Sequence, residues 1–157
     1  MRCEERREAG ARSDRSFEAL ACYQLSLKLL GAAYDLASKL PDFEKYNLAD
    51  QLRRAAVSVV LNIAEGYGRY HYLDKIRFFY IARGSLDELL SAFIACKEVH
   101  YTDSEQIVWV RSVHEEAHRS LNGFIGFIRK EAAGKEVFGD KYIREPETPY
   151  DWSGLNA

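Results

Sequence analysis

The chain has 157 residues, a mass of 18.0 kDa and a formal net charge of −2 at pH 7. This length suits one domain with a single hydrophobic core. A hydrophobic fraction of 47% with 29% charged residues is ordinary for a globular protein. The isoelectric point near 6.1 argues against a dedicated nucleic-acid binder, because such proteins are usually strongly basic.

Cysteine usage and the N-terminal sequence indicate the compartment. Cys3, Cys22 and Cys96 are odd in number and share no metal-ligand spacing. Residues 1–15 contain no apolar signal-peptide segment, and no apolar run approaches the roughly 18 residues that span a bilayer. We therefore expect a soluble cytoplasmic protein with reduced thiols and no membrane partner.

Residues 1–15 are rich in Arg and Glu, lack a periodic apolar face and are predicted to form a disordered leader. A first helix is predicted over residues 16–40, with Ser16 as its cap and Pro41 as its stop. Its apolar residues repeat at spacings of three and four, which is typical of a heptad seam. This seam consists of Leu20, Tyr23, Leu27, Leu30, Tyr34 and Ala37.

A second helix follows after a short loop. It is predicted to begin at Tyr46 or Leu48 and to end at Glu65, before Gly66 and Gly68. Nearly every position from 55 to 64 is apolar, although an amphipathic helix needs only about three apolar positions in seven. We therefore expect this helix to be covered on all sides, in part by a neighbouring subunit.

A third helix is predicted from Asp74, as its cap, to about Val99. Its seam consists of Phe79, Ala82, Leu86, Leu89, Phe93 and Cys96. A mid-helix glycine costs about 1 kcal/mol relative to alanine. We therefore expect Gly84 to allow close packing against the small residues 55–64.

A fourth helix is predicted from a turn and cap at residues 102–104 to about Ala133, with Gly134 as its stop. Its seam consists of Ile107, Val110, His114, Ala117, Leu121, Phe124 and Ile128. Four helices joined by short loops predict an all-α, antiparallel up-down-up-down four-helix bundle over residues 16–134. Residues 135–157 lose the period and are predicted to form an extended or disordered tail.

The stretch from residue 51 to residue 88 also carries a recognisable combination of motifs. Its members are Gln51, Leu52, Arg53, Arg54, Ala55, Ser58, Asn62, Ile63, Ala64, Glu65, Gly66, Arg69, Ile81, Ala82, Arg83, Gly84, Ser85, Leu86 and Glu88. In this combination the chain resembles the bacterial four-helix-bundle proteins of 23S rRNA intervening sequences. It also resembles the accessory variability proteins of diversity-generating retroelements, which share that fold.

The resemblance implies an assembly and two kinds of partner. Retroelement accessory proteins of this fold form pentameric rings that bind nucleic acid and a reverse transcriptase through a basic surface. A homopentameric ring is therefore implied here, with the apolar face of residues 55–64 as a candidate contact. The mildly acidic charge of this chain departs from the family pattern.

One sequence match suggests a different chemistry. Residues 114–118 read His-Glu-Glu-Ala-His, a literal HExxH pattern that places two imidazoles on one helix face, as a zinc protease requires. Glu136 follows as a possible third ligand. The structural interpretation is favoured, because His114 falls on the seam, His118 lies beside it toward the surface, and nothing else predicts a protease cleft. We expect no metal site, no cofactor and no catalytic residue.

Positive charge is concentrated in one segment. Between residues 45 and 83 there are seven cations and three acids, a net charge of +4, whereas residues 131–157 carry −3. Arginines alternate there with Tyr67, Tyr70, His71 and Tyr72, residue types that contact phosphates and stack on unpaired bases. The predicted phosphate contacts are Arg53, Arg54, Arg69, Lys75 and Arg77. A solvated charged face is the plainer alternative.

A set of polar and small residues occupies positions that look buried. They are Ser58, Asn62, Glu65, Arg83, Gly84, Ser85 and Glu88. A catalytic interpretation would pair Glu65 with Glu88 around a site. The structural interpretation is an inter-helix network that serves assembly, in which Glu65 or Glu88 pairs with Arg53 or Arg83 and Asn62 bonds a facing backbone or side chain, because unpaired burial of such groups costs several kcal/mol.

These observations favour a non-enzymatic, homo-oligomeric four-helix-bundle protein that binds RNA or DNA, in the manner of an accessory to a reverse transcriptase. The alternative is a protein-interaction scaffold that binds no nucleic acid and recruits its partner through the aromatic C-terminal tail.

Overall fold

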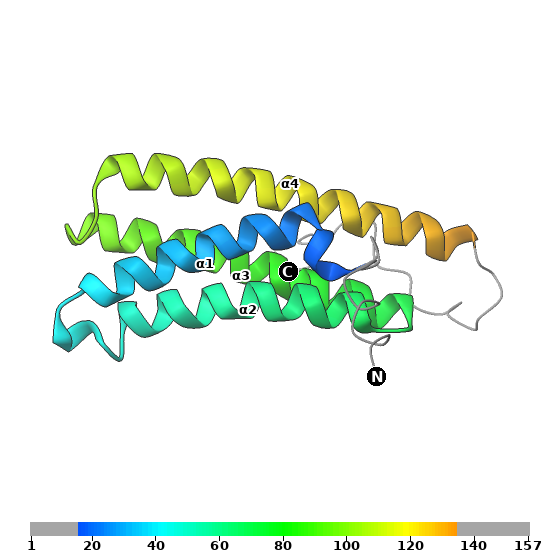
Figure 1. The fold of residues 1–157 in the computed structure, drawn as a ribbon, viewed down its shortest axis with the longest axis horizontal. Helices are drawn as coiled ribbons and strands as arrows, with labels where there is room; N and C mark the ends of the chain where they lie inside the picture. Colours follow the sequence, from blue (N-terminus) through cyan, green and yellow to red (C-terminus); the bar gives the residue numbers. More distant parts are fainter. Residues whose placement is uncertain (1–15, 135–157) are drawn as a thin grey trace, which may run out of the picture.

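The computed structural model describes residues 16–134, and the predicted leader and tail lie outside this range. The described chain forms four α-helices, arranged as an antiparallel bundle in which each helix reverses the direction of the one before (Figure 1). They are α1 (Ala21–Lys39), α2 (Leu48–Gly68), α3 (Tyr72–Glu98) and α4 (Ser104–Gly134), with short 3₁₀ turns η1 (Phe17–Ala19) and η2 (Asp42–Glu44). The predicted all-α bundle is confirmed.

The start and the buried face of the first helix differ from the prediction. Ser16 caps η1, where its hydroxyl accepts a hydrogen bond from the Glu18 amide, and α1 begins only at Ala21. The residues that α1 buries are Cys22, Ser26, Leu29, Ala33, Leu36 and Ala37. Leu27 and Tyr34 of the predicted seam are exposed. The predicted seam is therefore rotated away from the core, because it was drawn through the larger side chains of α1.

The second helix continues past its predicted end. Gly66 lies inside α2 and is buried, and the helix ends at Gly68. A Cβ atom at Gly66 would lie 3.0 Å from Cβ of Phe78 and 3.1 Å from the carbonyl oxygen of Lys75. Glycine at this position is therefore the residue that lets α3 pack directly against the last turns of α2.

The third helix buries the seam that was predicted for it. Its N-terminal cap and the role of Gly84 differ from the prediction. All six predicted seam residues are buried. His71 occupies the cap position and Asp74 lies in the first turn, where its charge complements the helix dipole. Gly84 is exposed, and a Cβ atom there would meet nothing within 4 Å. The predicted close packing at Gly84 is therefore wrong within one chain, and Gly66 has that role instead.

The fourth helix follows its predicted seam and is capped by Asp103, whose carboxylate accepts a 2.8 Å hydrogen bond from the Gln106 amide. Six of the seven predicted seam residues are buried, and Phe124 is half-buried. Along the described chain, no helix is long and apolar enough to cross a membrane.

A buried carboxylate joins the two connections at one end of the bundle. Glu44, in the α1–α2 connection, accepts hydrogen bonds from the Leu48 amide at 3.2 Å, from Nδ2 of Asn47 at 2.9 Å and from Oη of Tyr101 at 3.2 Å. Tyr101 reaches this position because His100 adopts a left-handed φ of 65° after α3, and the Tyr101 amide then donates to the Cys96 carbonyl in a Schellman-type ending. The Glu44–Tyr101 bond therefore ties the α1–α2 connection to the α3–α4 connection.

Substitution of Gly66 tests the close packing of α2 on α3. We expect Gly66→Val to destabilise the protein by about 1–3 kcal/mol, because the added atoms would overlap Phe78 and the α3 backbone. The matched control is Gly31→Ala in α1, where a Cβ atom meets nothing within 4 Å. The control should raise stability by up to about 1 kcal/mol. Urea denaturation at one fixed protein concentration measures both, and equal stability of Gly66→Val and wild type would contradict the packing.

The thiol of Cys96 should make the stability of the protein depend on pH. Burial, and secondarily the negative charge of Glu44, raise the pKa of Cys96 from 9.0 to about 11. The folded protein therefore keeps this proton up to about pH 11, whereas the unfolded chain releases it near pH 9, so stability present below pH 9 is lost as the pH rises from 9 to 11. Urea denaturation across this window should give a shallower decline for Cys96→Ala than for wild type; parallel curves would contradict the raised pKa.

Candidate assembly face and basic turn

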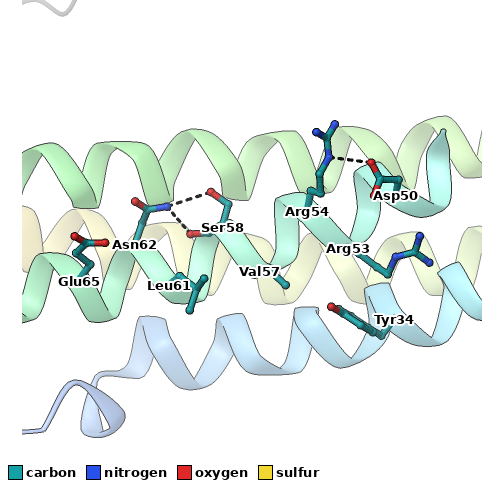
Figure 2. A pocket seen from close by; sticks show the side chains of 9 residues that line it. All are labelled: Tyr34, Asp50, Arg53, Arg54, Val57, Ser58, Leu61, Asn62 and Glu65. Atoms are coloured by element: carbon teal, nitrogen blue, oxygen red, sulfur yellow. Dashed lines mark hydrogen bonds and ion pairs between the residues drawn. The ribbon is translucent and has the colours of Figure 1, made fainter. Parts of the chain in front are cut away.

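The outer side of α2, together with Tyr34 of α1, forms a shallow groove (Figure 2). Its lining residues are Tyr34, Asp50, Arg53, Arg54, Val57, Ser58, Leu61, Asn62 and Glu65. Ser58 and Asn62 point toward α3, whereas Leu61 points toward α1 (Figure 2). Helical spacing places residues 51, 54, 58, 62 and 65 along one stripe of α2. These residues belong to the family motif, so much of that motif lies on the outer side of the helix.

Apolar side chains are exposed on this face. Leu61 of α2 is 60% exposed and Ile81 of α3 is 43% exposed, while Val57 is half-buried. The chain's own core therefore does not cover α2 on all sides, and the cover expected from a neighbouring subunit stays a prediction. Together with the open space at Gly84, these side chains form what we call the assembly face.

The polar residues of the assembly face are paired, but not with the predicted partners. The hydroxyls of Ser58 and Ser85 lie 2.7 Å apart and join α2 to α3. Asn62 Nδ2 donates to the Ser58 carbonyl at 2.8 Å and to its hydroxyl at 3.1 Å. Gln51 donates to Glu88, which links the same two helices nearer the start of α2. The serine pair was not predicted, because sequence spacing within one helix does not reveal register against another.

The predicted pairing of Glu65 and Glu88 with Arg53 or Arg83 is wrong. Glu65 forms its ion pair with Arg69, four residues along the same helix. Both carboxylates are exposed, so neither forms a catalytic pair in a shielded site. Arg83 instead points toward α4, because its position on α3 faces that helix.

The predicted phosphate contacts lie in two groups, one near the start of α2 and one around the α2–α3 connection. The first group, near the start of the helix, is engaged within the chain: Arg53 donates to the Lys45 carbonyl at 3.1 Å, and Arg54 lies 3.1 Å from Asp50. Fifteen residues separate Arg54 from Arg69, which corresponds to about 22 Å of helix. The five predicted cations therefore do not form one patch.

The second group surrounds the short α2–α3 connection. Arg69 pairs with Glu65 and its guanidinium lies 4.7 Å from the ring centre of Phe78. Lys75 Nζ donates to the Tyr67 carbonyl at 2.9 Å, and burial lowers the pKa of Lys75. Arg77 is exposed and forms no ion pair with any described residue. We call residues 69–77 the basic turn.

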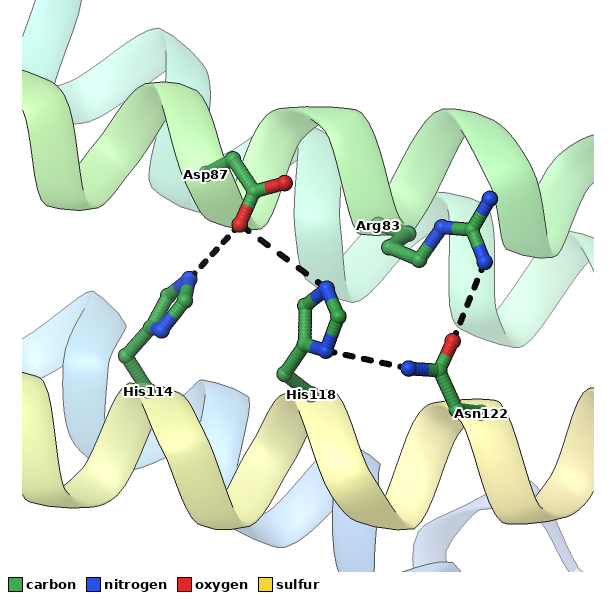
Figure 3. Close-up of polar contacts among 5 residues, drawn as sticks. All are labelled: Arg83, Asp87, His114, His118 and Asn122. Atoms are coloured by element: carbon green, nitrogen blue, oxygen red, sulfur yellow. Dashed lines mark hydrogen bonds and ion pairs between the residues drawn. The ribbon is translucent and has the colours of Figure 1, made fainter. Parts of the chain in front are cut away.

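A polar row between α3 and α4 was not predicted from the sequence (Figure 3). Asp87 Oδ1 lies 2.8 Å from Nε2 of His114 and 4.0 Å from Nε2 of His118. Nδ1 of His118 lies 3.0 Å from Nδ2 of Asn122, whose Oδ1 accepts a 3.1 Å hydrogen bond from Arg83. In the sequence these polar residues form two series with steps of four positions, which places each series on one helix face. The series are residues 83 and 87 on α3, and residues 114, 118 and 122 on α4.

This row gives the HExxH match its structural role. His114 is buried and His118 is half-buried, as predicted. Both histidines turn toward Asp87 of the neighbouring helix. Among residues 16–134, no group of three His, Cys, Asp or Glu side chains is placed to hold a metal ion, and Glu136 lies outside the described residues.

Comparisons with known proteins agree with this fold. A family model for 23S rRNA-intervening sequence proteins matches residues 18–123. The chain is similar to a solved structure from Bacteroides thetaiotaomicron VPI-5482, a protein of unknown function from the S23 ribosomal protein family, with a TM-score of 0.61 and 21% sequence identity. The similarity covers 67% of this chain and 95% of that one. A search of curated proteins found no match.

Proposed function

The chain belongs to the 23S rRNA-intervening sequence protein family, and from this premise we propose that it is a non-enzymatic, homo-oligomeric protein that binds nucleic acid. The observation that carries the proposal is the assembly face, where Leu61 and Ile81 are exposed among paired polar groups. Protein–protein contacts bury exposed apolar side chains of this kind together with polar groups.

Exposed apolar groups on two diagonal helices favour a ring over a simple dimer. α2 and α4 each pack on α1 and α3, so they occupy opposite corners of the bundle (Figure 1). Leu61 is exposed on α2, and Trp109 and Phe127 are exposed on α4. A contact between two different surfaces repeats head to tail and closes into a ring when the rotation permits. The pentamer stays a prediction of the family resemblance.

The basic turn supports binding to nucleic acid. It presents Arg77, which has no ion pair with any residue from 16 to 134, and Arg69, whose guanidinium lies over Phe78. A homo-oligomer repeats this turn once per subunit, so a chain with a net charge of −2 still displays a recurring basic surface. Arg53 and Arg54 lie near the other end of α2, outside the basic turn.

One observation favours the scaffold alternative. Four of the five predicted phosphate contacts donate to, or pair with, groups of the same chain. A scaffold needs no free cations, and its protein partner would bind the assembled face. A reverse transcriptase as that partner, and the tail as its binding site, stay predictions from the sequence.

The mass of the protein in solution tests assembly. We expect light scattering to give several times 18.0 kDa for wild type. Leu61→Glu should lower this mass, because a buried unpaired carboxylate opposes the contact. Phe43→Glu is the matched control, since Phe43 is exposed in the α1–α2 connection, away from the assembly face. A monomeric wild type, or an unchanged mass for Leu61→Glu, would contradict the proposed contact.

A labelled-RNA shift at two salt concentrations tests nucleic-acid binding. We expect binding that weakens steeply with salt, since each neutralised phosphate releases counterions. Arg77→Glu should weaken it and reduce the salt slope by about one, while the same charge change at the exposed Arg111 of α4 should have a smaller effect. Absence of binding at low salt would instead support the scaffold.

A further inference from the structure

The structure distinguishes among the aromatic side chains that alternate with the cations of the basic turn. Tyr67 packs inward, with its ring 6.4 Å from that of Phe124 in a stacked arrangement. Tyr72 is half-buried against the core. Tyr70 is 76% exposed, and the exposed His71 meets its ring edge-on at 5.3 Å. Tyr70 is therefore the tyrosine beside these cations that is most exposed to solvent.

The cations beside Tyr70 also differ in whether their charged groups are engaged within the chain. Lys75 is directed back to the Tyr67 carbonyl, so its ammonium is engaged in closing the end of α2. The guanidinium of Arg69 lies over Phe78, the neighbour in sequence of Arg77. Arg69 comes immediately before Tyr70, and the exposed Arg77 follows in the second turn of α3. The two arginines therefore lie on either side of Tyr70 in the chain.

We propose that Tyr70 stacks on an unpaired base while Arg69 and Arg77 contact the adjoining phosphates, so that the nucleic acid bound by this protein is single-stranded at the basic turn. The inference rests on the proposed function and specifies its ligand. Within a duplex both faces of each base are covered by neighbouring bases. An exposed tyrosine can therefore stack only on a base whose face is uncovered, as in a single strand.

The short connection between α2 and α3 holds Tyr70 close to the arginines in the chain. Only residues 69–71 separate the two helices, and Arg69 and His71 at its ends have extended backbone conformations. Gly66 holds the end of α2 against α3 immediately before this connection. Tyr70 is thus presented from a short connection between two closely packed helices, so little backbone has to be ordered when a base binds.

Fluorescence anisotropy with labelled single-stranded and double-stranded oligonucleotides of equal length tests the proposal. Both RNA and DNA strands are used, because an unpaired base of either kind offers the same stacking face. We expect Tyr70→Ala to weaken single-strand binding at least fivefold, the lower end of the range for loss of one stacked base, and Tyr70→Phe to retain it. Tyr46→Ala is the matched control, since Tyr46 is 85% exposed near the opposite end of α2; it should bind as wild type.

The outcomes separate this inference from the proposed function. If wild type binds single strands more tightly than duplex and only Tyr70→Ala loses that preference, the inference is supported. If wild type binds nucleic acid with steep salt dependence but Tyr70→Ala binds single strands as wild type does, the inference is wrong and the proposed function stands. If wild type binds neither form at low salt, both are wrong.

Discussion

The close packing of α2 on α3 is the constraint on which the rest of this structure depends. At Gly66 the atoms of Phe78 and the Lys75 carbonyl come to about 3 Å of where a side chain would begin, and the paired hydroxyls of Ser58 and Ser85 continue the contact toward the middle of the helices. This approach turns Lys75 inward, buries one side of Tyr67 and leaves Tyr70 outside. It also aligns the outward residues of the two helices into one face. Packing within the subunit therefore determines which groups remain available for contacts beyond it.

The sequence predicted the number, order and direction of the helices and the buried faces of α3 and α4. In those two helices the residues of the predicted seam are buried, apart from the half-buried Phe124, so the helical period and the observed burial agree there, even though Ile81, Trp109 and Phe127 outside the seam are exposed. The first helix shows why this can fail: its core face includes Cys22, Ser26 and Ala33, whereas Leu27 and Tyr34 are exposed. A seam predicted from hydrophobicity gives most weight to large side chains. Where a neighbouring helix packs closely, however, the buried positions hold small side chains. The same limitation assigned close packing to Gly84 instead of Gly66.

Pairings between helices were the least predictable part of the candidate site. Spacing identifies which residues share a face of one helix, and it identified Ser58, Asn62 and Ser85 correctly as members of a polar set. It does not give the register of one helix against another, on which the contact of Asp87 with His114 depends. The HExxH pattern has the same limit. It places two imidazoles on one helix face, and the neighbouring helix determines what they contact, which here is the carboxylate of Asp87.

The hydrogen bond between Glu44 and Tyr101 has a consequence for how the protein folds. It spans 57 residues of sequence, whereas α1 with α2, and α2 with α3, can dock as successive hairpins that close short loops. Closing a long loop costs entropy before its contacts are gained. We therefore expect this bond to form late, after the helices have docked, and to be largely absent from the transition state. An interaction of that kind has little influence on the folding rate and acts mainly by slowing the opening of the native protein. The two ends of the bundle would then differ in kinetic stability, with the end that carries Glu44 the slower to open.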